Sequence, residues 1–329
     1  MARAGSHRRT GVTSARDSGF ARSLRDLVAG EVREQEALAR WSTYRIGGHA
    51  TVLFPGNPED VALALQHCTA LGVPWFALGL GSNLLFPDDG LDALVIRLGK
   101  GVDAFRQDGA RFTLGAGLPA PTAAKRTASL GYGGIHKMVG VPGSVGGGVV
   151  MNAGCHHAEW RDTVVSVLVV DADGRDRVVP AADCGFSYRR SALSEFVVLE
   201  TVVDLHAADR VALEAETEKL YAWRREGTPF NQPCCGSVFK NPELPADWAT
   251  DAPRTSGQFI EATGLKGLRT GTAEVSPMHA NYFINTGNAT AGDVRTLMRT
   301  VRSRVEERWG VVLDPEVKLI GAAGIVVPL

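Results

Sequence analysis

The chain has 329 residues, 44% of them hydrophobic, and its 35 Lys and Arg nearly balance its 36 Asp and Glu. This composition is that of a globular protein with room for two or three domains, each with its own core. The charge balance provides no basic field to attract nucleic acid, and no stretch approaches the roughly 20 consecutive apolar residues that span a bilayer. We therefore expect neither nucleic acid nor a membrane as a partner.

Cysteine usage and the N-terminal composition indicate where the protein works. The five cysteines show no disulfide-framework spacing, which favours a reducing, cytoplasmic location. Residues 1–37 are polar and rich in arginine, and they lack the apolar core of a secretory signal. We predict that they form a flexible arm leading into a short helix.

The first predicted domain covers residues 38–207. Short apolar runs separated by glycine turns predict strands, and two segments with helical character interrupt them. Because strands and helices do not alternate strictly, the pattern favours an α+β fold over a doubly wound sheet. The strands are predicted at 51–54, 93–96, 112–114 and 164–170, and the helices at 58–71 and 120–130.

The second predicted domain covers residues 215–323. A segment rich in Glu, Lys, Leu and Ala at 213–225 predicts a connecting helix. A further helix is predicted over 256–263, and a longer amphipathic helix over 289–309 with Gly310 as its stop.

Three glycine clusters lie in the first domain. They comprise residues 79–83, residues 115–117, and residues 140–148 running on to 152–154. Glycine lets successive backbone N–H groups approach phosphate oxygens, although any one cluster taken alone is more typical of a tight turn. Together they predict a cradle for a large phosphate-bearing cofactor. The dinucleotide fingerprint Gly-x-Gly-x-x-Gly is not present at the required spacing.

A second group of polar residues predicts a reaction site. Ser237 follows a glycine and precedes Lys240 and Asn241, which suits ligand contact but is also typical of a polar turn. Arg189 could hold a carboxylate or an enolate, and Glu316 stands where a turn enters a strand. The spacing of Cys155, His156, His157 and Glu159 fits no standard metal motif, so we expect no metal.

Taken together, these segments resemble the UDP-N-acetylenolpyruvoylglucosamine reductases, the flavoenzymes of bacterial cell-wall precursor synthesis. The resemblance runs from about residue 42 to residue 320 and rests on many motifs in order. These motifs are Thr43–Gly48, Gly81–Leu85, Val141–Gly147, Met151–Gly154, Tyr188–Ser191, Gly236–Pro242, Gly264–Gly267, Val275–Asn285 and Pro315–Val317.

The resemblance implies an FAD-binding domain of the vanillyl-alcohol-oxidase (PCMH) type, followed by a smaller α+β substrate domain. It also implies that NADPH reduces the flavin and leaves before the enolpyruvyl ether of UDP-N-acetylglucosamine enters. The flavin N5 then gives hydride to the methylene carbon, Ser237 protonates the neighbouring carbon, and Arg189 and Glu316 stabilise the enolate. UDP-N-acetylmuramate is the product. To donate to an enolate, Glu316 needs a raised pKa.

The resemblance also assigns binding residues by motif. Substrate contacts fall on Tyr188, Lys240 and Asn241, in a chain of the shorter family type that we expect to be a monomer or weak dimer. The cofactor contacts fall on Tyr44, Arg45, Gly47, Gly79, Gly81, Ser82, Asn83, Gly115, Pro142, Gly143, Ser144, Gly146, Gly147, Asn152 and Gly154.

Several positions depart from the family pattern and leave other functions open. One alternative is a paralogue that reduces a different enol ether or activated alkene. Another is an oxidase on the same scaffold, with Cys155 or His156 as a covalent flavin attachment. The departures are His136, Cys155, His156, His157, Cys234 and Cys235.

Overall fold

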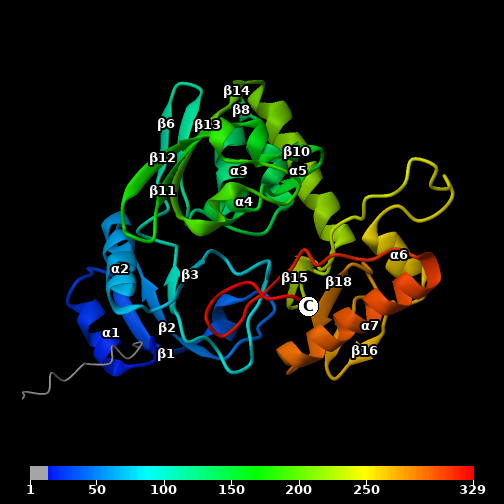
Figure 1. Ribbon diagram of the computed structural model, residues 1–329. Coiled ribbons are helices and arrows are strands. Elements are labelled where there is room, and N and C mark those ends of the chain that lie inside the picture. The colour runs from blue at the N-terminus through cyan, green and yellow to red at the C-terminus, as the bar shows by residue number, and fades with distance from the viewer. Residues whose placement is uncertain (1–13) are drawn as a thin grey trace, which may run out of the picture.

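The computed structural model describes residues 14–329, and these residues fold into three parts (Figure 1). The first part is a four-stranded sheet in the order β1-β2-β5-β3, in which β1 and β2 are antiparallel and the other neighbours are parallel. Its elements are α1 (Ser18–Arg25), β1 (Glu31–Ala37), β2 (His49–Phe54), α2 (Pro58–Leu71), β3 (Trp75–Leu78) and β5 (Leu94–Arg97).

The second part is a five-stranded antiparallel sheet in the order β12-β11-β13-β7-β6. Small strands and turns of 3-10 helix connect its larger elements, including η2 (Ile135–Gly140) and the hairpin of β9 (Gly154–Cys155) and β10 (Ala158–Glu159). The larger elements are β6 (Phe105–Asp108), β7 (Arg111–Gly115), α3 (Ala120–Ser129), α4 (Val145–Val150), β11 (Val164–Val170), β12 (Asp176–Pro180), β13 (Val197–Asp204) and α5 (Arg210–Gly227).

The third part is a smaller antiparallel sheet in the order β15-β18-β17-β16, with α6 and α7 beside it (Figure 1). After α7 the chain returns to the first part, where β19 (Lys318–Leu319) pairs in parallel with β4 (Leu84–Leu85). The elements of the third part are β15 (Cys234–Ser237), α6 (Ser256–Ala262), β16 (Arg269–Thr270), β17 (Ala273–Val275), β18 (Tyr282–Asn285) and α7 (Ala291–Trp309).

Local sequence signals explain where the two long predicted helices begin and end. Helix α2 covers the predicted residues because Asn57 caps its first turn and Gly72 ends it in the left-handed conformation, with φ 67°. Helix α7 begins two residues later than predicted, since Thr290 and Asp293 form a reciprocal capping box. Gly310 ends it with φ 67°, as predicted. The mixture of antiparallel sheets and packed helices confirms the α+β class.

The described part of the N-terminal segment is folded and does not form the predicted flexible arm. Residues 1–13 lie outside the described part of the chain, but residues 18–25 form α1, and residues 31–37 form β1 on the edge of the first sheet. Phe20 and Leu24 of α1 are buried in the core. The physical reason is that these few apolar residues form one face of the helix, a pattern that the surrounding arginines obscured.

No helix within residues 14–329 is long and apolar enough to cross a membrane. The described cysteines are all free, and four of the five are buried.

A buried carboxylate in α2 holds the N-terminal segment in place. Asp60 is 2% exposed, and its two oxygens accept hydrogen bonds from the backbone N–H groups of Ala29, Gly30 and Gly56. We expect Asp60→Ala to lower the free energy of unfolding by about 3 kcal/mol, because it removes three hydrogen bonds from backbone N–H groups to a carboxylate. Urea denaturation measures this loss, and Glu59→Gln, on the exposed side of the same turn, is the control. Equal stability of the two variants would contradict the assignment.

Candidate active site

The predicted glycine clusters meet at one place in the structure. Ser82 Oγ donates a hydrogen bond to the carbonyl of Pro142 at 2.8 Å, which joins the first cluster to the third. A Cβ added to Gly79 would lie 2.3 Å from Ser144 Oγ, so only glycine allows this approach. Gly143 has φ 147°, and a Cβ there would lie 3.3 Å from Ser82 Oγ. The loops at 79–83 and 142–147 therefore form one surface.

This surface has free backbone donors that fit a diphosphate. The N–H groups of Ser82, Asn83 and Ser144 donate to no acceptor within residues 14–329, although Ser144 is only 2% exposed. A buried donor without a protein partner indicates a ligand or ordered water. Gly147 is exposed, and a Cβ there would come no closer than 3.5 Å to its nearest neighbour, so the loop is open on this side. The observed geometry fits FAD.

The other predicted cofactor glycines are explained by protein packing. A Cβ on Gly115 would lie 2.4 Å from the backbone nitrogen of Ala104, and one on Gly146 would lie 2.7 Å from Cβ of Ala116. Their N–H groups donate to the carbonyls of Ala104 and Ala116 respectively. The missing side chain at Gly115 lets β7 lie against residues 102–104, and the one at Gly146 lets α4 lie against Ala116.

The segment around Tyr44 joins the first part to the third. The Tyr44 ring is fully buried in the core of the third part, and its carbonyl accepts a hydrogen bond from Asn285 at 3.0 Å. Arg45 is exposed with φ 55°, and Gly47 packs its α-carbon against Phe86. The Tyr44 side chain thus serves packing, which leaves only its backbone for the predicted cofactor contact.

Arg189 lies at the tip of a tight turn and points at a carboxylate. Ser187 and Arg190 close the turn by two backbone hydrogen bonds, and Arg189 itself has φ 55°. Its Nε donates to Glu316 Oε1 at 2.9 Å, and its Nη2 donates to the carbonyl of Gly154 at 3.0 Å. The Tyr188 ring lies under the guanidinium, 4.9 Å from the carbon Cζ to the ring centroid.

Glu316 reaches this pair from the C-terminal segment, 127 residues away in sequence. Its N–H donates to the carbonyl of Val238, and its carbonyl accepts from the Asn83 side chain at 3.1 Å. The side chain is 17% exposed. Burial raises the pKa of Glu316, and the charge of Arg189 offsets part of this shift. Two segments from different parts of the protein thus hold the backbone of Glu316, and Arg189 binds its carboxyl.

Ser237 ends strand β15 beside this pair. It stands opposite Tyr282 in β18, and a bulge at Gly236, where φ is 80°, interrupts the ladder just before it. The Ser237 hydroxyl makes no hydrogen bond to any residue within 14–329. Arg224 Nη2 donates to the Tyr282 hydroxyl at 2.5 Å. We call Ser237, Arg189 and Glu316 the reaction cluster: Arg189 and Glu316 pair directly, and Ser237 immediately precedes Val238, whose carbonyl accepts the Glu316 N–H.

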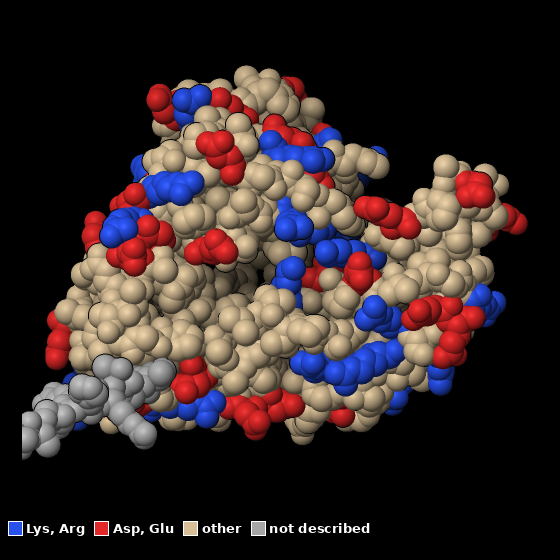
Figure 2. Space-filling view, in the orientation of Figure 1, with Lys and Arg blue, Asp and Glu red and all other residues tan. Residues whose placement is uncertain are grey.

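Positive side chains gather around the reaction cluster. Burial lowers the pKa of Lys318, and the positive charges of Lys240 and Arg190 lower it further. Both cations therefore lie near Lys318. None of these three cations forms an ion pair with a carboxylate of the described residues. Figure 2 shows Lys and Arg side chains bordering the hollow between the parts of the molecule. Sequence reasoning named Lys240 but missed Arg190, Arg224, Tyr282 and Lys318, although all but Arg224 lie in or beside the quoted motifs.

Two predicted binding residues already have protein partners. Asn241 Oδ1 accepts from the N–H of Ser256 at the start of α6, which leaves its amide nitrogen for a ligand. The fully buried Asn152 uses its side chain to join Glu159, the carbonyl of Ser187 and the N–H of Arg161. Asn152 therefore supports the turn that carries Arg189.

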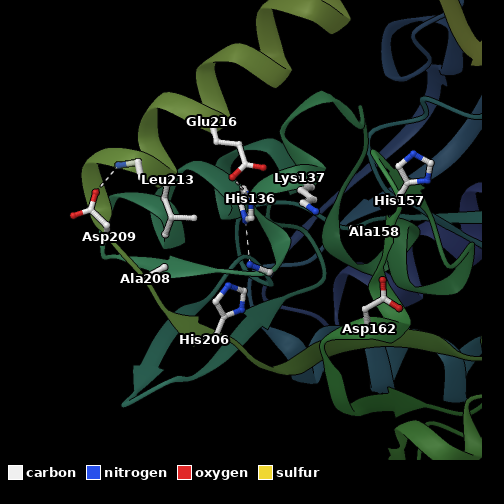
Figure 3. A pocket seen from close by; sticks show the side chains of 12 residues that line it. His136, Lys137, His157, Ala158, Asp162, His206, Ala208, Asp209, Leu213 and Glu216 are labelled. Atoms are coloured by element: carbon white, nitrogen blue, oxygen red, sulfur yellow. Dashed lines mark hydrogen bonds and ion pairs between the residues drawn. The ribbon is translucent and has the colours of Figure 1, made fainter.

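Two of the histidine departures, His136 and His157, line a pocket that contains no residue of the reaction cluster. The pocket has a volume of about 490 Å³. Figure 3 shows the side chains of His136, His157 and His206 that line it. His136 Nδ1 accepts from the N–H of Gly134, and Nε2 lies 3.4 Å from Glu216, while burial lowers the His136 pKa. None of the predicted site residues lines this pocket, and no group of described residues could hold a metal ion.

Comparison with known proteins agrees with this arrangement. Residues 49–178 match an FAD binding domain family, and residues 228–320 match the C-terminal domain of UDP-N-acetylenolpyruvoylglucosamine reductase. The UDP-N-acetylenolpyruvoylglucosamine reductase of Halalkalibacterium halodurans is 37% identical over 302 residues, which cover 91% of this chain and 97% of the relative. The UDP-N-acetylenolpyruvoylglucosamine reductase of Rubrobacter xylanophilus is 40% identical over 290 residues, which cover 87% of this chain and 94% of the relative.

Solved structures show the same relationship. The chain matches the crystal structure of UDP-N-acetylenolpyruvylglucosamine reductase from Thermus caldophilus with a TM-score of 0.74 and 31% identity, over 88% of this chain and 99% of that one. A match to 6-hydroxy-D-nicotine oxidase from Arthrobacter nicotinovorans has a TM-score of 0.60 and 13% identity, over 87% of each chain, and shows the fold alone.

The FAD-binding domain and the reductase C-terminal domain define this protein as a flavoprotein oxidoreductase. More specifically, the chain belongs to the UDP-N-acetylenolpyruvoylglucosamine reductase family.

Proposed function

We propose that this chain uses NADPH to reduce the enolpyruvyl ether of UDP-N-acetylglucosamine to UDP-N-acetylmuramate. The observation that carries the proposal is the reaction cluster, in which Arg189 pairs with a partly buried Glu316. Ser237, whose hydroxyl has no hydrogen-bond partner within residues 14–329, immediately precedes the residue that accepts the Glu316 N–H. Such a pair provides fixed donors where negative charge develops on an enolate. The names of the relatives supply the substrate class.

FAD, when bound on the 79–83 and 142–147 loops, supplies hydride transfer between NADPH and the methylene carbon of the substrate. Ser82, Asn83 and Ser144 would hold its phosphates through their free N–H groups. Because Gly79 has no Cβ, Ser144 can lie against it, which keeps the two loops close together.

The remaining chemistry falls on the chain's own residues. The Ser237 hydroxyl donates a proton to the carbon that bears the carboxylate, and a strongly basic carbanion makes this weak acid sufficient. Arg189 holds the substrate carboxylate and the developing enolate. Burial raises the pKa of Glu316, and in its protonated form the carboxyl would donate a hydrogen bond to the same oxygen.

The cations around the cluster would bind the anionic ends of the two substrates. Lys240, Lys318 and Arg190 carry charge without carboxylate partners among the described residues, and both NADPH and the UDP-sugar bear phosphates. Asn241 adds its free amide group. The same excess of positive charge suits both substrates, which agrees with their use of one site in turn.

The test is an anaerobic half-reaction experiment. NADPH should reduce the yellow protein completely, and enolpyruvyl-UDP-N-acetylglucosamine should then reoxidise the flavin rapidly without oxygen. If the flavin is reduced but the UDP-sugar leaves it reduced, the chain uses a different alkene. If oxygen alone reoxidises it rapidly and the flavin resists release by acid, the chain is an oxidase.

The glycine loops give a separate test of the cofactor site. We expect Gly79→Ala to weaken FAD binding at least tenfold, because its methyl group would displace Ser144 and open the loop. Flavin content after purification and an FAD titration of the apoprotein measure this effect. Gly287→Ala is the control, since Gly287 is exposed and a Cβ there meets nothing within 3.7 Å. Full flavin retention in Gly79→Ala would overturn the assignment.

A further inference from the structure

A second carboxylate stands behind the Arg189 guanidinium. Glu159 in β10 is 18% exposed, and its Oε1 lies 4.0 Å from Arg189 Nη1, on a different nitrogen from the one that meets Glu316. Arg189 therefore lies between two carboxylates that come from different segments of the chain. Glu159 has no part in the proposed chemistry.

Glu159 also controls the turn that carries Arg189. Its Oε2 accepts a hydrogen bond from Asn152 Nδ2 at 2.9 Å, and the same amide nitrogen donates to the carbonyl of Ser187 at 3.0 Å. Asn152 is fully buried and cannot find other partners. On the far side of the turn, Ser191 Oγ donates to the carbonyl of Val150 at 2.7 Å.

This support is needed because Arg189 is conformationally strained. A non-glycine residue at φ 55° lies in the left-handed region, which costs about 1 kcal/mol or more unless the surroundings hold it. The guanidinium must also keep its distance from Glu316 while the substrate binds. A misplacement of about 1 Å in such a group costs about a hundredfold in rate.

We propose that Glu159 is a positioning residue: it fixes Arg189 for the second half-reaction by orienting Asn152 and by pairing with Nη1 of the guanidinium. This inference rests on the proposed function, since it concerns reduction of the enolpyruvyl ether. It implies that Glu159 matters for the step in which Arg189 meets the enolate and leaves reduction of the flavin by NADPH unaffected.

The test compares two substitutions in the full-length holoenzyme. Glu159→Gln keeps an acceptor for Asn152 but loses the charge, and Glu159→Ala loses both. We expect flavin reduction by NADPH to stay within about twofold of the unsubstituted protein. Reoxidation by enolpyruvyl-UDP-N-acetylglucosamine should slow by about 3–10-fold in Glu159→Gln and by about 10–100-fold in Glu159→Ala.

Two controls separate positioning from general stability. Arg161→Ala removes the exposed partner of Glu159, whose Nε lies 2.8 Å from Oε2, and should leave both half-reactions unchanged. Glu159→Ala combined with Arg189→Lys should be no slower than Arg189→Lys alone, because both act through one group. Melting temperature and FAD content report any loss of structure, because Glu159 also caps a turn of 3-10 helix at residues 160–162.

The outcomes are distinct. If the unsubstituted protein is not reoxidised by the UDP-sugar, the proposed function fails. If it is reoxidised and Glu159→Ala behaves like it, only the positioning role fails. Two results would show that Glu159 is merely structural and would overturn the inference. One is that Glu159→Ala loses FAD and slows both half-reactions to the same extent. The other is that the effects of Glu159→Ala and Arg189→Lys on the reoxidation rate are additive.

Discussion

In the Ser237→Ala variant, NADPH is expected to reduce the flavin at the normal rate. The rate at which enolpyruvyl-UDP-N-acetylglucosamine reoxidises the flavin should fall by about 10²–10⁴-fold. The reason is that the Ser237 hydroxyl has no hydrogen-bond partner in residues 14–329, and that Ser237 precedes Val238, which binds the backbone of Glu316. Removing the hydroxyl takes away the proton donor without disturbing the cofactor loops. Anaerobic stopped-flow absorbance in the flavin bands measures both rates separately.

Ser276→Ala is not a suitable control for this experiment, because the Ser276 hydroxyl accepts hydrogen bonds from two backbone N–H groups. Ser303→Ala, on the exposed face of α7, changes the same atoms far from the cofactor loops. It should leave both half-reactions as they are. Reoxidation of Ser237→Ala at the unsubstituted rate would mean that another group protonates the carbon.

The second large effect concerns Glu316 and pH. Glu316→Ala should slow reoxidation by about 10²–10³-fold, since it removes a fixed donor from the developing enolate. Because the proposal requires the protonated form, and burial raises the pKa of Glu316, the rate in the unsubstituted protein should fall as pH rises through that raised pKa. Glu316→Gln keeps a neutral hydrogen-bond donor, so its reoxidation rate should no longer decrease as the pH rises.

The same shift has a consequence for stability. Folding raises the pKa of Glu316, so the folded state binds the proton more tightly than the unfolded state. This stabilisation of the folded state is fully present below the ordinary pKa of glutamate. It is lost as the pH rises through the raised pKa of the folded protein. Glu316→Gln should therefore become more stable relative to the unsubstituted protein over that pH interval, as urea denaturation at several pH values can measure.

For the reaction itself, a reoxidation rate independent of pH between 5 and 9 would contradict the role of a protonated Glu316.

The sequence by itself determined the class of fold, the main helices and the family. Helix α2 and helix α7 are marked by local signals, namely their caps and the glycines that end them, and such signals act within a few residues. The reaction cluster was also predicted, although only through motifs shared with relatives. Nothing in the local sequence of Glu316 distinguished it from a solvated residue at a strand edge.

Only the tertiary structure decided how these residues meet. Glu316 reaches Arg189 because β19 pairs with β4 and brings the end of the chain back to the first part. The burial that raises the Glu316 pKa, the cations around Lys318 and the support from Glu159 all arise from contacts between distant segments. Electrostatic energies and desolvation depend on distances in space, and a sequence lists its residues without those distances.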